Sequence, residues 1–276
     1  MKFIDSHAHV NFNAFKDDYR EVIGRSMEGE VGVINVGSQY STSKRAVDFA
    51  NEFANVWAAI GVHPLHLQKQ SFTHQDSEEL PATEIITSGE DPVMADYFAL
   101  GQNKKVVAIG EVGLDYHHFE DGDDIEKIKH KQKIVLNDFI CLANELDLPI
   151  ALHCWDAYTD LLEILKNNPV KRGGVVHSFI GSYKTARKFI ELGFFIGLNG
   201  VITYSDSFDR LIKEVEVEHI ILETDCPYLT PGGKRGTRNE PTGVIDVANH
   251  LARIKGISPE EVARQTTENS INLFRL

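Results

Sequence analysis

The chain contains little cysteine and no long apolar run. Its three cysteines, Cys141, Cys154 and Cys226, are odd in number and show no CxxC spacing, which argues against a disulfide framework and favours a reducing compartment. No apolar stretch approaches the roughly 18 residues that a membrane span needs. Polar residues stand near the start of the chain, where a signal peptide would be apolar. We therefore expect a cytoplasmic protein that does not associate with membranes.

Positive charge is also scarce. The chain has 28 Lys and Arg against 41 Asp and Glu, a formal net charge of -13. A field of this sign repels nucleic acid at long range. A polyanionic substrate must therefore be held by local cations or by metal, and no feature of the sequence indicates an obligatory protein partner.

The sequence has the composition and the alternation of a large α/β domain. At 276 residues, 42% hydrophobic and 25% charged, it is long enough to bury a full core. Short apolar β-rich segments alternate with longer helical patterns such as Ile125 to Leu146, as in βα units around a parallel sheet. Eight strands are expected, at residues 2–6, 31–36, 56–60, 106–110, 149–152, 174–176, 194–198 and 220–223. Eight such units predict a (β/α)8 TIM barrel that forms a single domain over residues 1–276.

Two stretches depart from this regular alternation. Residues 66–105 are rich in polar side chains and predict an extended connection with one or two helices. Residues 241–276 predict two helices that complete the outer ring. The second begins with Ser258 as N-cap, Pro259 at the first helical position and Glu261 in a capping box.

The segment FIDSHAHVN at 3–11 contains a candidate metal-binding pair. Side chains two apart on a strand point the same way, so His7 and His9 can face one ion. A His-x-His pair is as often structural as it is metal-binding, so its position after the first expected strand is what favours a site.

Five further candidates stand just after expected strands. They are His63 after the third, Glu111 after the fourth, His153 after the fifth, His177 after the sixth and Asp225 after the eighth. All strand C-termini of a parallel barrel open onto one face, where barrel enzymes build their sites. Structural histidines and acids would be scattered over helices, loops and both ends of the strands. We therefore predict that these side chains converge.

The ligand types constrain the metal. Imidazoles and carboxylates without thiolate suit Zn, Mn, Fe and Ni, or Mg with more water. These histidines and the two acids are enough for two divalent ions, and Glu111 is the natural bridge because a carboxylate has two oxygens to share. Two ions can hold both the attacking and the leaving oxygen of an in-line displacement. Asp225 could orient the attacking water and accept its proton.

Several motifs together resemble one known family. FIDSHAHVN, GVHP, AIGEVGLDY, LETDCPYLTP and RNEP are similar, in order and spacing, to the TatD family of metal-dependent deoxyribonucleases. The similarity extends to NSINLF at 269–274. It implies an amidohydrolase-like barrel with two divalent ions (Mg, Mn or Zn) that hydrolyses DNA, single-stranded or at ends, often as an exonuclease. It further implies that one ion is held by His7, His9, Glu111 and Asp225, the second by Glu111, His153 and His177, and that His63 contacts the scissile phosphate.

One position departs from the family pattern. The fifth strand ends in HCWDA, with Trp155 where the family usually has arginine. A phosphate contact is then lost. Trp155 either stacks on a base, as aromatic side chains do in single-strand sites, or packs against a neighbouring loop. Of the two we favour packing.

A cluster of cations follows the eighth strand. The segment PGGKRGTRNEP at 231–241 contains Lys234, Arg235 and Arg238. Glycines let the backbone approach a phosphate, and guanidinium groups match its geometry. The position beside Asp225 predicts a phosphate-binding loop, in which Arg238 either contacts phosphate or braces the loop.

Other polar residues receive weaker predictions. We expect Cys154 and Cys226 between barrel and helices, because neighbouring strand residues point to opposite sides. His117 and His118 either reach the site or lie at the surface, and of the two we favour the surface. Asp5 either supports a ligand or is a plain strand-end acid.

The sequence therefore predicts a metal-dependent deoxyribonuclease in which Asp225, Glu111 and His63 are catalytic. One alternative is an amidohydrolase that cleaves an amide, lactone or ester in a small molecule, because the same ions polarise a carbonyl. Another is a non-catalytic binding protein whose metals are structural.

Overall fold

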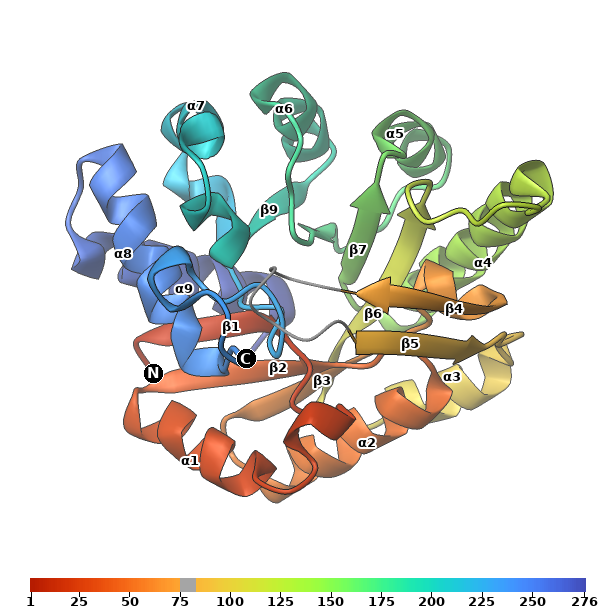
Figure 1. Ribbon diagram of the computed structural model, residues 1–276, viewed down its shortest axis with the longest axis horizontal. Helices are drawn as coiled ribbons and strands as arrows, with labels where there is room; N and C mark the ends of the chain where they lie inside the picture. The colour runs from red at the N-terminus through yellow and green to blue at the C-terminus, as the bar shows by residue number, and fades with distance from the viewer. Residues whose placement is uncertain (75–82) are drawn as a thin grey trace.

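Eight parallel strands form a barrel in the computed structural model of the protein, which describes residues 1–74 and 83–276 (Figure 1). Neighbours are paired in the order β1-β2-β3-β6-β7-β8-β9-β10. The strands are β1 (Phe3–Ala8), β2 (Val31–Val36), β3 (Val56–Ile60), β6 (Val106–Asp115), β7 (Ile150–Trp155), β8 (Gly174–Val176), β9 (Phe194–Leu198) and β10 (Ile220–Leu222). All eight expected strands are confirmed, and the barrel with them. β6 runs five residues beyond its expected end, to Asp115.

The first and last strands meet at a seam that is closed near their C-terminal ends. Asp225 N donates to His7 O at 2.8 Å, and His9 N donates to Cys226 O at 2.8 Å. The buried Asp5 carboxylate accepts from Thr224 N at 2.9 Å and from Thr224 Oγ1 at 2.6 Å. Asp5 is therefore a structural group that ties β1 to the end of β10. The same bonds place Asp225 beside His7 and His9.

Helices follow the strands and cover the outside of the barrel. They are α1 (Tyr19–Glu28), α2 (Tyr40–Glu52), α3 (Met94–Gly101), α4 (Ile125–Leu146), α5 (Tyr158–Asn167), α6 (Tyr183–Glu191), α7 (Asp209–Glu214), α8 (Val244–Lys255) and α9 (Pro259–Phe274). The expected helix over 125–146 is confirmed in full. Asp124 caps its start, and apolar residues at helical spacing, including Val135 and Phe139, face the core. Within the described residues, none of the helices combines the length and the apolar character needed to cross a membrane.

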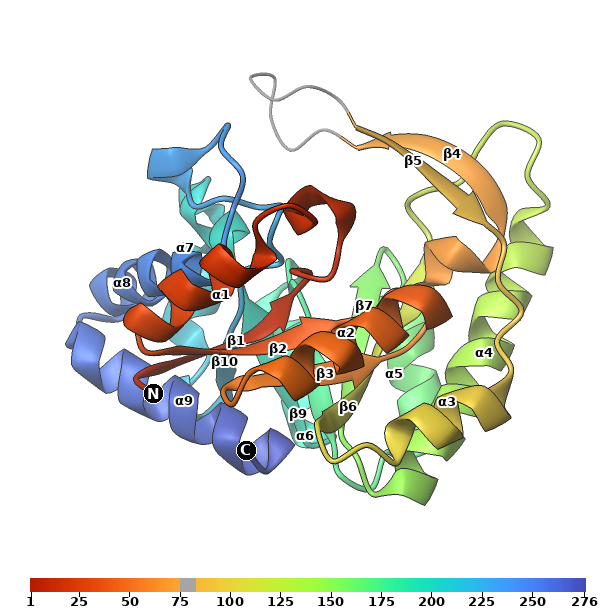
Figure 2. The same cartoon turned by 90° about the horizontal axis from the view of Figure 1, so that it is seen from below.

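The two C-terminal helices are also confirmed, and the second has a further role. The Ser258 side chain accepts from Glu261 N at 3.1 Å, with Pro259 at the first helical position. Leu273 and Phe274 of α9 join the apolar cluster inside the barrel. Figure 2 shows α9 at the end of the barrel opposite the hairpin. α9 thus plugs the N-terminal end of the barrel instead of lying only in the outer ring.

The connection from β3 to β6 contains an element that we did not predict. Besides the expected helix, α3, it forms an antiparallel hairpin of β4 (Lys69–His74) and β5 (Thr83–Ser88). Residues 75–82 of this connection lie outside the described residues. In Figure 2 the hairpin stands on the side of the barrel where the strands end. We missed it because a two-stranded ribbon needs support from the surrounding structure, which its short polar strands do not reveal.

Candidate metal centre

His7 and His9 of β1 both point into the C-terminal mouth of the barrel. His9 Nδ1 lies 3.0 Å from Val36 O, which leaves Nε2 to face the site. His9 Nε2 is 3.2 Å from Asp225 Oδ1, and His7 Nε2 is 3.4 Å from Glu111 Oε2. The structure thus brings together the two histidines and the two acids that we expected around one ion.

The Glu111 carboxylate lies at the middle of the cluster. Its Oε1 is 3.1 Å from His153 Nδ1, 3.5 Å from His63 Nε2 and 3.7 Å from His177 Nε2. Its Oε2 faces His7 and His9 on the other side. Burial opposes ionisation of Glu111, but the surrounding imidazoles hold its pKa well below the usual range. An ionised carboxylate with one oxygen toward each group of histidines is arranged to bridge two cations.

A glycine lets β6 and β7 approach closely enough to make this arrangement. Gly113 is paired with His153 across the two strands. A Cβ at Gly113 would lie 1.9 Å from His153 O, and its φ of +155° favours glycine. The absence of a side chain at Gly113 therefore sets how near Glu111 and Asp115 come to His153.

Two carboxylates that the sequence analysis missed orient the second pair of histidines. Asp115 Oδ2 is 3.0 Å from His153 Nε2, and Glu223 Oε1 is 2.9 Å from His177 Nδ1. Each leaves the other ring nitrogen facing Glu111, as carboxylates behind metal-bound histidines do. Asp115 stands four residues after Glu111 within β6, a spacing that could have indicated it, whereas Glu223 lies just past β10, where strand alternation gives no signal.

His63 has the geometry of a hydrogen-bond donor. It caps a short 3-10 helix (Pro64–Leu67), and its Nδ1 accepts from Leu65 N at 3.2 Å. The ring proton is therefore on Nε2, which faces the site and has no lone pair for a metal. Burial lowers the pKa of His63 to about 3, so the ring is neutral at pH 7. The contact of His63 with the scissile phosphate stays a prediction.

The cluster fits divalent metal. Its ligand atoms are imidazole nitrogens and carboxylate oxygens. In the part of the chain that the structure describes, three groups of them lie close enough to hold an ion: His7, His9 and Glu111; His63, Glu111 and His153; and His7, His177 and Glu223. Among the described residues, neither ring nitrogen of the buried His7 makes a hydrogen bond of good geometry. Buried polar atoms are normally satisfied, and a metal ion would satisfy His7. Because His63 Nδ1 accepts from Leu65 N and the ring proton is on the site-facing Nε2, His153 and His177 are the better ligands for the predicted second ion.

Metal binding should release protons at neutral pH. Burial alone would lower the pKa of both His153 and His177, but their carboxylate neighbours raise it to about 9 and about 10. Both rings are then protonated at pH 7 without metal and must lose a proton to bind an ion. We expect the release of about two protons when both rings bind metal. Between pH 6 and 8, each released proton should make the metal affinity rise about tenfold for each unit of pH. Calorimetry in buffers of different ionisation enthalpy measures this, and binding without proton release would contradict it.

Replacing Asp115 by asparagine should weaken the second ion selectively. The amide cannot orient His153 as the carboxylate does, and losses of this kind cost about 10- to 100-fold in metal affinity. Competition with a chelator of known affinity would show one weakened site and one unchanged site. Asp138→Asn, at an exposed position of α4, is the matched control.

Trp155 packs against the loop that follows β6. Its ring stacks on His117 with centroids 4.6 Å apart and planes at 18°, and meets His118 edge-on at 5.1 Å. This agrees with packing as the favoured interpretation. His117 is exposed as expected, but His118 is only 28% exposed, because its Nδ1 lies 3.0 Å from the buried Asp115. For His118 the surface prediction was wrong.

The cations of the 231–241 segment contact other groups of the protein. Lys234 Nζ is 2.8 Å from Asp246 Oδ2, and the Arg235 guanidinium lies 4.5 Å from the Tyr204 ring centroid. Arg238 forms a two-pronged ion pair with Asp18 and donates to Ala14 O at 2.7 Å. Arg238 thus braces the loop, and a phosphate contact for these three residues stays a prediction.

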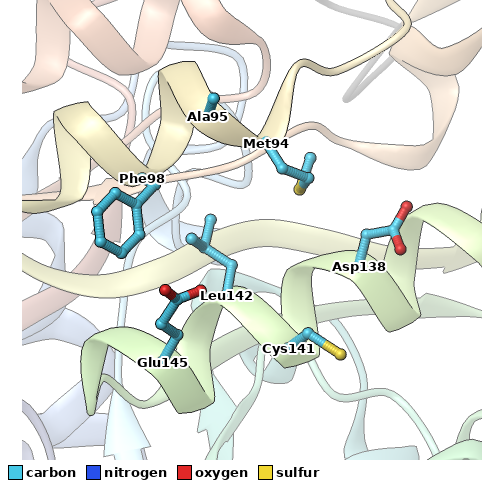
Figure 3. Close-up of a pocket in the computed structure, with 7 residues that line it drawn as sticks. All are labelled: Met94, Ala95, Phe98, Asp138, Cys141, Leu142 and Glu145. Atoms are coloured by element: carbon cyan, nitrogen blue, oxygen red, sulfur yellow. The ribbon is translucent and has the colours of Figure 1, made fainter.

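The thiols lie away from the metal centre. Cys154 and Cys226 are buried in the layer between barrel and helices, as expected. Cys141 lines a hollow of about 420 Å³ between α3 and α4, together with Met94, Phe98 and Leu142 (Figure 3). This hollow is on the outside of the barrel and shares no residue with the metal centre.

Comparison of the sequence with known families and proteins gives a consistent result. The sequence profile described as TatD related DNase matches residues 4–275. The chain is 37% identical over 276 residues to the uncharacterized metal-dependent hydrolase YabD of Bacillus subtilis strain 168, covering 99% of this chain and 98% of that protein. It is 30% identical over 283 residues to the uncharacterized metal-dependent hydrolase YcfH of Escherichia coli K12, covering 100% and 97%.

Solved structures agree with the fold. The TatD homologue YjjV of Escherichia coli K12 superposes with a TM-score of 0.84 at 29% identity, covering 100% of this chain and 98% of that one. A TatD family hydrolase of Entamoeba histolytica gives a TM-score of 0.80 at 23% identity, covering 99% and 97%.

Proposed function

Because the chain belongs to the family of TatD-related DNases and is a metal-dependent hydrolase, we propose that it hydrolyses phosphodiester bonds of DNA with two divalent ions. The observation that carries the proposal is the Glu111 carboxylate, which faces imidazoles on both sides. Such a carboxylate would hold two divalent ions, one on each side. We place the enzyme in the cytoplasm, where free thiols such as those of Cys141, Cys154 and Cys226 persist.

The residues around the centre have separate tasks in this reaction. Two bound ions would polarise the phosphate and lower the pKa of the attacking water. Asp225, whose side chain is 17% exposed while that of Glu111 is 5% exposed, is the acid nearer to the opening and accepts the proton of that water. The neutral His63 donates its Nε2 proton in a hydrogen bond to a phosphate oxygen. Lys234, Arg235 and Arg238 remain candidate contacts for phosphates further along the DNA.

The test is hydrolysis of a short end-labelled single-stranded DNA by metal-stripped protein that is re-supplied in turn with Mg, Mn and Zn. We expect stepwise shortening that requires metal and is absent in Glu111→Ala. The ladder of products gives the direction of digestion. A protein that binds two ions and cleaves no DNA would exclude the proposal.

One observation favours a small-molecule substrate as the second candidate. Lys234 and Arg238 are already paired with Asp246 and Asp18, so they are less available to a polyanion. Replacing Lys234, Arg235 and Arg238 together by neutral residues distinguishes DNA from a small-molecule substrate. With DNA the substitutions should raise KM and make KM less dependent on salt concentration. Hydrolysis of a neutral amide, lactone or ester should be nearly unchanged.

A further inference from the structure

Beside the metal centre, two aromatic rings form a flat surface that the reaction does not use. We propose that this surface, the stack of His117 on Trp155, binds an unpaired nucleobase of the substrate, with the base lying on the outer face of the His117 ring. The proposal rests on the proposed function and narrows its substrate class to DNA with an unpaired base next to the scissile phosphate.

The position of Trp155 on its strand brings the stack to the mouth of the barrel. Trp155 is the last residue of β7 and stands two residues after His153, so both side chains leave the same face of the strand. Two residues of strand span about 6.6 Å. In the register of the sheet, Trp155 lies opposite Asp115 of β6. The Trp155 ring therefore begins about two strand residues from His153, a predicted metal ligand.

The stack leaves one ring face open. Trp155 covers one face of His117 with nearly parallel planes, yet the His117 side chain is 49% exposed. The His118 ring lies 5.0 Å from His117 and 5.1 Å from Trp155, nearly perpendicular to both, so it packs at the side of the stack. We therefore assign the exposed part of His117 to the face that Trp155 does not cover. His117 Nδ1 lies 2.9 Å from Asp156 Oδ2, which fixes the orientation of the ring.

The loop that contains His117 is bound to the same carboxylate that orients His153. Asp115 Oδ1 accepts from His117 N and from His118 N, each at 3.0 Å, and Asp115 Oδ2 faces His153 Nε2 at 3.0 Å. His118 in turn meets the edge of Trp155. One buried group therefore holds both the metal-facing ring and the flat surface, so a base on His117 and a phosphate at the ions would keep a fixed separation.

The chemistry of the surface fits a base better than a phosphate. Trp155 presents an uncharged aromatic ring, and Asp156 next to it is negative. Every base has a π-face, and stacking on an aromatic side chain contributes about 1 to 3 kcal/mol per base with little sequence preference. The two faces of a base are covered by its neighbours within a duplex, so such a surface selects unpaired ends.

The first measurement is binding of DNA followed through Trp155. The chain has two tryptophans, so Trp57→Phe leaves Trp155 as the sole indole. Metal-loaded protein is titrated with a short phosphorothioate single strand and with the same strand carrying an abasic site next to its end. We expect the normal strand to change the fluorescence of Trp155 and to bind about 5- to 150-fold more tightly than the abasic strand. Equal binding of the two strands would overturn the proposal.

The second measurement uses hydrolysis and needs no change at Trp57. His117→Ala should raise KM for single-stranded DNA by a similar factor with little change in kcat, and should remove the preference for the normal over the abasic strand. His117→Phe should restore both, and His130→Ala, at an exposed position of α4, should behave as wild type. DNA cleavage that is unaffected by His117→Ala would refute the stacking site alone. No cleavage of either strand by the wild type would refute the proposed function with it.

Discussion

Replacing Glu111 by glutamine should abolish hydrolysis and leave the protein with at most one bound ion. The carboxylate has five imidazole nitrogens within 4 Å of its two oxygens. An amide keeps the shape but offers one oxygen and no charge, so it cannot bridge two cations. Removing a main element of transition-state stabilisation costs about 3 to 4 kcal/mol or more, which corresponds to a loss of at least about 10²- to 10³-fold in kcat. Metal content per chain and kcat, measured on one preparation, check this.

The Glu111→Gln protein should nevertheless stay folded. Its barrel is held by the backbone ladder of the strands, which the substitution does not change, and by apolar clusters on both sides of the strands, which do not include Glu111. Circular dichroism and thermal unfolding of the metal-free proteins provide the control. A matched variant, Glu163→Gln at an exposed position of α5, should keep both ions and full activity. A folded Glu111→Gln protein with two ions and unchanged kcat would refute the bridging role.

Replacing Asp225 by asparagine should separate catalysis from metal content. Asp225 Oδ1 is 3.2 Å from His9 Nε2 and Oδ2 is 3.9 Å from His177 Nε2, so an amide oxygen at this position can still face an ion. It cannot accept the proton of the attacking water. We expect kcat to fall at least about 10²-fold, the upper part of the range for general acid–base catalysis being about 10⁴-fold, while most of the metal is retained. KM should change little.

The pH profile tells the two roles of Asp225 apart. If Asp225 accepts the proton, the pH profile of kcat in Asp225→Asn should differ in shape from that of the wild type, not merely be scaled down. Loss of both ions from the variant would instead make Asp225 chiefly a ligand. Full activity in a folded Asp225→Asn protein would exclude either role.

Much of the fold could be predicted because barrel strands are apolar and bounded by sharp changes in pattern. The convergence of His7, Glu111, His153, His177 and Asp225 followed from one rule, that parallel strands end on the same face of the barrel. The rule works without knowing which strands are neighbours. It therefore tolerated the insertion of a hairpin between β3 and β6.

What could not be predicted depends on contacts between distant residues. Asp115 and Glu223 were missed because their partners, His153 and His177, lie on other strands. The ion pair of Arg238 with Asp18 joins residues 220 positions apart, so the sequence could not separate a brace from a phosphate contact. The role of α9 as a plug depends on Leu273 and Phe274 meeting the barrel interior, which no local pattern encodes.

The seam between β1 and the end of β10 makes the order of synthesis matter. The residues that close it, such as Asp5 and Thr224, are 219 positions apart, and the first predicted ion has ligands on both sides. During synthesis His7 and His9 leave the ribosome long before Asp225. A complete metal centre can therefore form only after the last strand has left the ribosomal exit tunnel. An ion held by His7, His9 and Asp225 would link the beginning and the end of the barrel reversibly. Since a ligand of the folded state stabilises it by about 2.7 kcal/mol at a hundredfold excess over Kd, scarcity of metal would leave newly made chains easier to unfold as well as inactive.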